Sequence, residues 1–111
     1  MRTIVFVFVL LMAGIGSVQG QKVYKVKYES QADIKVYVVE YESQADLKVF
    51  FVEYASQAVE DGLWYFVKYE SQADKKLYFV EYESQADLKI YIVKYESQAG
   101  WENKEKQYLL L

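Results

Sequence analysis

Short apolar runs alternate with polar connectors along most of the chain. The runs are rich in valine, isoleucine and aromatic residues, as in residues 36–41 (Val-Tyr-Val-Val-Glu-Tyr), and this composition is typical of β-strands. Each run ends at a tyrosine that Glu-Ser-Gln-Ala follows, or Ala-Ser-Gln-Ala in one unit; the six tyrosines are Tyr28, Tyr41, Tyr54, Tyr69, Tyr82 and Tyr95. The pattern predicts an all-β domain of six short repeated strands.

The spacing of the repeat tyrosines divides the array into two sets of three. Successive tyrosines are 13, 13, 15, 13 and 13 residues apart, and the longer interval contains Val59, Glu60, Asp61 and Gly62. A connector that gains two residues and a glycine is suited to a wider turn. We therefore expect this segment to join two related halves.

Side-chain alternation predicts apolar residues on both faces of each strand. Tyr37, Val39 and Tyr41 would share one face, and Val36 and Val38 the other. We assign the tyrosine rows to core and interface packing, with stacking of sugars or bases as the alternative; the first row is Tyr24, Tyr37, Tyr65, Tyr78 and Tyr91. Trp64 and Trp101 depart from the repeat and are expected to close the ends of the packed layer. Lys25 interrupts the first run, which predicts that its strand lies at an edge.

The connectors carry the signature of compact corners. Ser30 and Asp33, like Ser43 and Asp46, have the Ser-x-x-Asp spacing of a capping box, so we expect each hydroxyl and carboxylate to close one helical turn. The repeated glutamines are expected to satisfy backbone groups or each other. The connectors lack proline, glycine and asparagine, which disfavours tight hairpins, and they are too short for a helical crossover.

The two ends of the chain differ from the repeat. Residues 1–20 place Arg2 before an apolar run and then small residues, which is the layout of a cleaved secretory signal. We expect cleavage after about Gly20, a single β repeat domain over residues 21–101, and a secreted or periplasmic location. Residues 102–111 are expected to form a mobile tail, with docking of Leu109 to Leu111 as the less favoured alternative.

The residue types offer no reactive cluster. The chain has no histidine and no cysteine, and its serines recur at equivalent positions: Ser30, Ser43, Ser56, Ser71, Ser84 and Ser97. A nucleophile needs an activating base and is normally singular, so we expect no catalytic residue. The carboxylates recur with neighbouring lysines, so we expect neither a metal site nor a bound cofactor. Without Arg2, 12 lysines face 16 acidic residues, which argues against binding to nucleic acid.

One family shares these features. The recurring Val-Tyr-x-Val-x-Tyr-Glu-Ser-Gln-Ala-Asp, the join Asp61-Gly62-Leu63-Trp64-Tyr65 and the closing Ala99-Gly100-Trp101 resemble the small bacterial septoil-knot domain family. The resemblance implies an all-β fold with a backbone tied in a seven-crossing torus knot and no established biochemical function. It also suggests two interleaved circuits, in which the strand at residues 36–41 pairs with a strand from Trp64 onward rather than with its neighbours in sequence.

The function expected from the sequence is correspondingly coarse. We expect a compact, unfolding-resistant structural or interaction domain that is not an enzyme, has no membrane span after leader cleavage, and is a monomer with self-association left open. A carbohydrate or cell-envelope binding module that uses the tyrosine rows is one alternative. A subunit that polymerises through its strand edges is the other.

Overall fold

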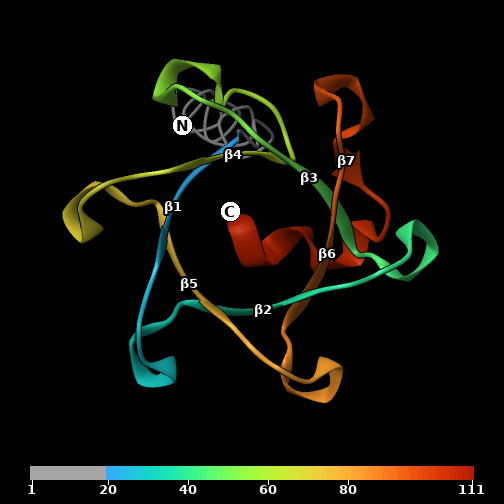
Figure 1. Ribbon diagram of the computed structural model, residues 1–111, viewed down its shortest axis with the longest axis horizontal. Helices are drawn as coiled ribbons and strands as arrows, with labels where there is room; N and C mark the ends of the chain where they lie inside the picture. The colour runs from blue at the N-terminus through green and yellow to red at the C-terminus, as the bar shows by residue number, and fades with distance from the viewer. Residues whose placement is uncertain (1–19) are drawn as a thin grey trace, which may run out of the picture.

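Six strands of similar length close into a barrel in the computed structural model, which describes residues 20–111 (Figure 1). The strands are β1 (Gln21–Lys25), β2 (Ile34–Val38), β3 (Leu47–Phe51), β4 (Leu63–Phe66), β5 (Lys75–Phe79) and β6 (Leu88–Ile92), and a short β7 (Gly100–Trp101) pairs with β3. Short 3₁₀ helices form the corners: η1 (Glu29–Gln31), η2 (Glu42–Gln44), η3 (Ala55–Gln57), η4 (Glu70–Gln72), η5 (Glu83–Gln85) and η6 (Glu96–Gln98). The predicted all-β class of six repeated strands is confirmed.

Each of the six barrel strands pairs with strands of the other half of the chain. The order around the barrel is β4, β1, β5, β2, β6, β3 and back to β4, and all six ladders are parallel. β2, for example, lies between β5 and β6, with Ile34 opposite Leu77 and Val36 opposite Leu88. The predicted pairing between the two sets of three is therefore confirmed.

The chain travels around this barrel in two interleaved circuits. Consecutive strands are two places apart in the ring, so a strand of one circuit fits between two strands of the other. The exception is the step from β3 to β4, which are direct neighbours. This step contains the longer connector with Val59 and Gly62, and it displaces the second circuit by one place so that the circuits interleave.

Two expectations about the strands are wrong. The strand expected at residues 36–41, for example, begins two residues and ends three residues earlier, because the polar connector joins the ladder: Asp33 N–H already donates to the carbonyl of Lys76. β1 is not an edge strand, since it pairs with both β4 and β5. Its Lys25 lies at the end of the strand, where the Nζ atom is 5.6 Å from the centre of the Phe79 ring.

The barrel core is mainly aliphatic rather than tyrosine-rich. The buried cluster comprises Val23, Ile34, Val36, Leu47, Val49, Trp64, Leu77, Leu88, Ile90 and Leu110. The six repeat tyrosines are 59 to 66 % exposed, so the expectation that they pack in the core is wrong. They follow the strand ends by three residues, where the chain has turned outward into a corner (Figure 1). The strand tyrosines, such as Tyr37, are half-buried, and Trp64 lies within the core rather than at its end.

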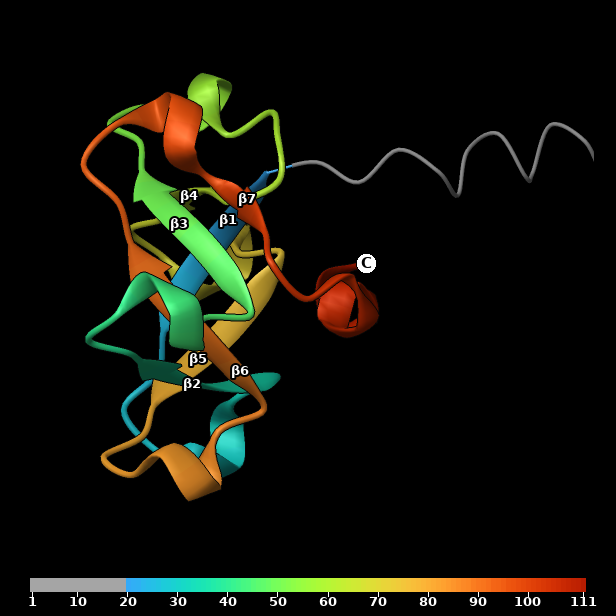
Figure 2. The ribbon, with the colours of Figure 1, turned by 90° about the vertical axis from the view of Figure 1, so that its right-hand side faces the viewer.

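The C-terminal segment lies across one mouth of the barrel. It forms η7 (Lys104–Leu110), and Leu110 is 4 % exposed within the core cluster (Figure 2). Gln21 Nε2 donates to the Leu110 carbonyl over 2.9 Å, and the N–H groups of Glu102 and Asn103 donate to the carbonyl of Asp46. The arrangement is the docked alternative, not the mobile tail expected over residues 102–111.

The leader expected at residues 1–20 lies, apart from Gly20, outside the residues that the structure describes. Within residues 20–111, no helix has the length and apolar character to cross a membrane.

Gly62 is the position where a side chain would disrupt barrel closure most directly. Its φ is +87°, and an added Cβ would lie 2.5 Å from the Lys48 carbonyl oxygen. We predict that Gly62→Ala lowers the free energy of unfolding by roughly 2–4 kcal/mol, since strain and overpacking add. Gly100→Ala is the control, because Gly100 also has positive φ (+145°) but has no neighbouring atom within 4 Å of an added Cβ. Equal losses for the two variants in chemical denaturation would contradict the close approach.

Candidate functional site

The corners use glutamine, not serine, to complete their hydrogen bonds. Gln31 Oε1 accepts the backbone N–H of Tyr28 over 3.3 Å, and Gln57, Gln72, Gln85 and Gln98 do the same for their own repeat tyrosines. The prediction that glutamines satisfy backbone groups is confirmed for these five. The six serines are exposed and their hydroxyls form no hydrogen bond within the described residues, so the predicted Ser-x-x-Asp capping boxes are wrong.

The aspartates hold neighbouring strands together instead. Asp87 N–H donates to the Lys35 carbonyl over 2.7 Å, and Asp87 Oδ2 accepts the N–H of the same lysine over 2.9 Å. The same two bonds join Asp33 to Lys76, Asp46 to Lys89 and Asp74 to Lys22. We call each such pair an aspartate clamp. Because a charged acceptor strengthens a hydrogen bond, each clamp stabilises one ladder between the two circuits.

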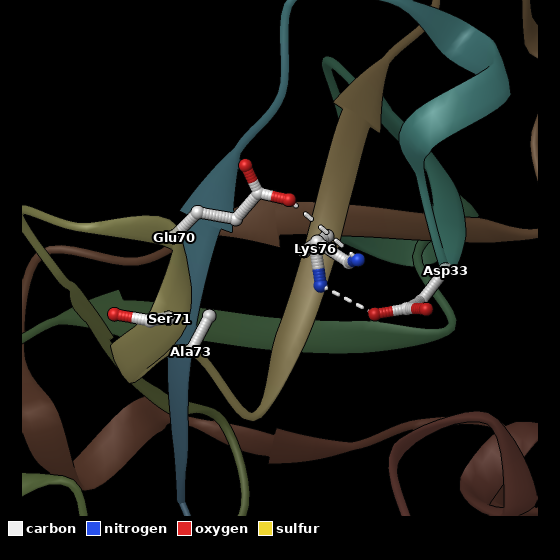
Figure 3. A pocket seen from close by; sticks show the side chains of 5 residues that line it. All are labelled: Asp33, Glu70, Ser71, Ala73 and Lys76. Atoms are coloured by element: carbon white, nitrogen blue, oxygen red, sulfur yellow. Dashed lines mark hydrogen bonds and ion pairs between the residues drawn. The ribbon is translucent and has the colours of Figure 1, made fainter.

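A shallow notch lies beside the clamp that joins Asp33 to Lys76. In Figure 3, Lys76 of β5 lies between Glu70, which is in η4, and Asp33, which precedes β2. The Lys76 Nζ atom is 3.6 Å from a Glu70 carboxylate oxygen, while its backbone N–H donates to Asp33 over 2.8 Å. Ser71 and Ala73 form the rest of the wall, and the notch has a volume of about 440 Å³.

The notch recurs at equivalent places around the barrel, which argues against a unique catalytic site. A second is lined by Ser84, Asp87 and Lys89, and a third by Ser30, Asp33 and Lys35. In each, the lysine forms an ion pair with the glutamate six residues earlier, at 3.4 Å for both Lys35 with Glu29 and Lys89 with Glu83. Such exposed pairs contribute little stability. The notches thus follow from the repeated corner itself.

The residue types that commonly hold metals or activate serines are missing or dispersed in the part of the chain that the structure describes. Over residues 20–111 no cluster of three or more Cys, His, Asp or Glu side chains is placed to hold a metal ion. The serine side chains are exposed, and the sequence has no histidine to act as their base. The four clamp carboxylates already accept backbone N–H groups, which leaves them poorly suited to proton transfer.

Asp61 and Lys48, both near the C-terminal segment, have raised pKa values. Burial raises the pKa of the Asp61 carboxyl; the Trp101 indole N–H nearby opposes that rise without forming a hydrogen bond of standard geometry, and Glu60 adds to it. Hydrogen bonding to Glu102 and then to Glu42 raises the pKa of Lys48. The Lys48 Nζ atom is 3.0 Å from Glu102 and 3.2 Å from Glu42, so it ties the C-terminal segment to β3 and η2.

A closed parallel barrel of interleaved repeats, held by aspartate clamps, defines a class of small repeat β-barrels. The model of one family, described as the 7(1) septoil knot domain, matches residues 20–102, and the chain belongs to this family. No curated protein matches the chain, and no solved structure does. The resemblance in the repeat motif is thus confirmed at the level of the family.

The clamps predict which residue of the connector matters for stability. Asp87→Ala removes the acceptor for the Lys35 N–H and should lower the free energy of unfolding by about 1–2 kcal/mol. Asp87→Asn keeps an acceptor oxygen and should cost less than half as much. Ser84→Ala, in the same connector, is the control and should change stability by less than about 0.5 kcal/mol. If Ser84→Ala lowered the free energy of unfolding in urea as much as Asp87→Ala does, the serine would cap the corner after all, and the prediction would be wrong.

Proposed function

We propose that the protein is an exported, non-enzymatic domain that serves as a compact, unfolding-resistant structural or interaction unit. The observation that carries this proposal is that all six barrel ladders join the first half of the chain to the second. Neither half can separate without breaking the whole sheet. A protein that meets proteases and changing conditions outside the cytoplasm benefits from such a structure.

We further propose that the backbone is knotted, as the name of the family implies. The interleaving of two circuits, each passing between strands of the other, supports this. The sequence has no cysteine, so disulfides are not the source of stability. A threaded backbone would instead slow unfolding, because the chain must be withdrawn through its own loops before the strands can separate.

The alternative functions receive less support from the arrangement. Edge-to-edge polymerisation needs an unpaired strand, whereas the six barrel strands are paired on both sides and β7 is two residues long. A polysaccharide platform needs aromatic rings gathered on one face. The exposed repeat tyrosines instead lie one to a corner, and the corners point away from one another around the barrel (Figure 1).

Export predicts a shortened N-terminus. The leader signature of residues 1–20 predicts that the protein recovered from the periplasm or medium begins near Gln21, as intact-mass spectrometry would show. Arg2→Glu combined with a charge inside the apolar run, Val7→Asp, should abolish the shortening. Protein outside the cytoplasm that still begins at Met1 would contradict a cleaved leader.

Slow unfolding is the test of the proposed role. We predict that the intact chain unfolds in denaturant at least about tenfold more slowly than a chain cut once between Val59 and Glu60, at an inserted protease site. Both residues are exposed and lie outside the strands, so the cut retains the paired strands but removes the connection between circuits. The uncut insertion variant is the control. Equal unfolding rates for cut and uncut protein would refute a role for threading.

A further inference from the structure

The barrel mouth opposite η7 carries an uncovered apolar ring. All six strands run in one direction, away from η7, so their C-terminal ends gather at this mouth (Figure 2). The inward position at each strand end, two residues beyond a core residue, is Lys25, Val38, Phe51, Phe66, Phe79 or Ile92. We call these six residues the open rim. Val38, Phe66 and Ile92 are 41, 37 and 41 % exposed.

The open rim is a built layer rather than a frayed end. The rings of Phe51 and Phe66 meet edge to face with centroids 5.1 Å apart, and Phe51 and Phe79 both pack against the core cluster. The chain covers its other mouth with η7 and buries Leu110 there. Over residues 20–111 no corresponding segment covers the open rim. Exposed apolar clusters of this kind mark interaction surfaces.

A ring of charges without ion-pair partners follows the open rim, although Lys27 and Lys68 each lie over the ring of the next tyrosine. Two residues after each rim residue stands an exposed charge: Lys27, Glu40, Glu53, Lys68, Glu81 or Lys94. Among the described residues none of the six has an ion-pair partner, whereas Lys35, Lys48, Lys76 and Lys89 all do. The cross-strand pairing that their mixed signs suggest is therefore absent within one chain. Their three positive and three negative charges balance.

We propose that the open rim binds the open rim of a second copy in a face-to-face, two-fold symmetric dimer. The charges follow the order Lys68, Lys27, Glu81, Glu40, Lys94, Glu53 around the barrel. Two-fold symmetry places the second ring face to face with the first, so that the order of its charges runs in the opposite sense. In one rotational register of the two rings, every lysine then lies opposite a glutamate of the other copy. Lys68 then faces Glu40 of the other copy, Lys27 faces Glu81, and Lys94 faces Glu53. A ring of one sign would repel its copy, and this ring does not.

The same register matches the apolar residues. It places Phe66 against Val38 of the second copy and Phe51 against Ile92, so each phenylalanine meets an aliphatic side chain. Lys25, the one polar member of the open rim, has its Nζ atom 5.6 Å from the centre of the Phe79 ring of its own chain, and in this register it also faces the Phe79 ring of the other copy, where a cation–π contact is favourable. Charge and shape therefore select one orientation.

Dimerisation through the open rim rests on the interaction role in the proposed function, and it assigns to that role both a surface and a partner. It replaces the monomer expected from the sequence with a dimer. It does not depend on slow unfolding, so a monomer that still unfolds slowly would overturn the dimer and leave the proposed function standing.

The test uses one pair of charges that cannot interact within a chain. β2 and β4 are three places apart in the barrel order, so Glu40 and Lys68 meet only across the interface. The purified protein, with its N-terminus determined by mass, would be examined by sedimentation velocity over a range of concentrations. We expect a monomer–dimer equilibrium in which Glu40→Lys weakens association at least tenfold, because symmetry repeats the repulsion twice. Adding Lys68→Glu in the same chain should restore it.

Controls separate the interface from other causes of association. Glu105→Lys makes the same charge change on η7, at the other mouth, and should leave the dimer unchanged. The double variant Glu40→Cys, Lys68→Cys should form disulfide-linked dimers on oxidation, while Glu105→Cys should not. A monomer at all concentrations with native circular dichroism would overturn the proposal, as would association that Glu40→Lys leaves unchanged. A monomer that instead captures another protein through the open rim would also overturn it.

Discussion

Pairing between the two halves of the chain is the constraint on which the rest of the structure depends. Each strand of the first circuit has strands of the second circuit on both sides, so no two strands that follow one another within a circuit form a ladder. The stabilising contacts therefore close long loops, and little structure can form before distant segments meet. The same feature makes the finished barrel cooperative, because opening one ladder exposes strands that belong to both halves.

Register in such a barrel needs a specific device, because the repeats are nearly identical. A slip by one residue would turn every core side chain outward. The aspartate clamp opposes this slip, since the same lysine provides both its N–H and its carbonyl to one aspartate. Asp46 has a second role: its carbonyl accepts the N–H groups of Glu102 and Asn103, and its Oδ1 accepts from the Asn103 side chain. The clamp on β6 is thus also the anchor of the C-terminal segment.

The fold class and the division into two sets follow from composition and spacing, whereas the pairing between the sets was expected from the resemblance to the septoil-knot family. The sequence does not reveal where the strands end, since Asp33 and Lys35 read as connector yet belong to the ladder. The exposure of the repeat tyrosines has the same cause. Alternation predicts a buried side chain only within a strand, and Tyr41 lies three residues beyond the end of β2. The docking of Leu110 depends on an open barrel mouth, which a linear pattern does not reveal. The clamps were hidden because Ser-x-x-Asp also describes a local cap.

The barrel is least regular where the two circuits join, between β3 and β4, a region that we call the seam. At this seam the stride around the barrel changes from two places to one, and Val59 and Gly100 stand where other units have a clamp aspartate. The seam ladder is short, with two residue pairs, and it requires the close approach of Gly62 to β3.

The buried polar side-chain atoms that lack a hydrogen-bond partner within the described residues all belong to this region. They are Asp61 Oδ1 and the Nε1 atoms of Trp64 and Trp101. Buried unpaired polar atoms destabilise a fold. Five regular ladders therefore offset one irregular seam, and β7 lies beside that seam, where it pairs with β3 and where Gly100 approaches Gly62. β7 is then part of the closure of the barrel, and the family match, which runs to residue 102, includes it.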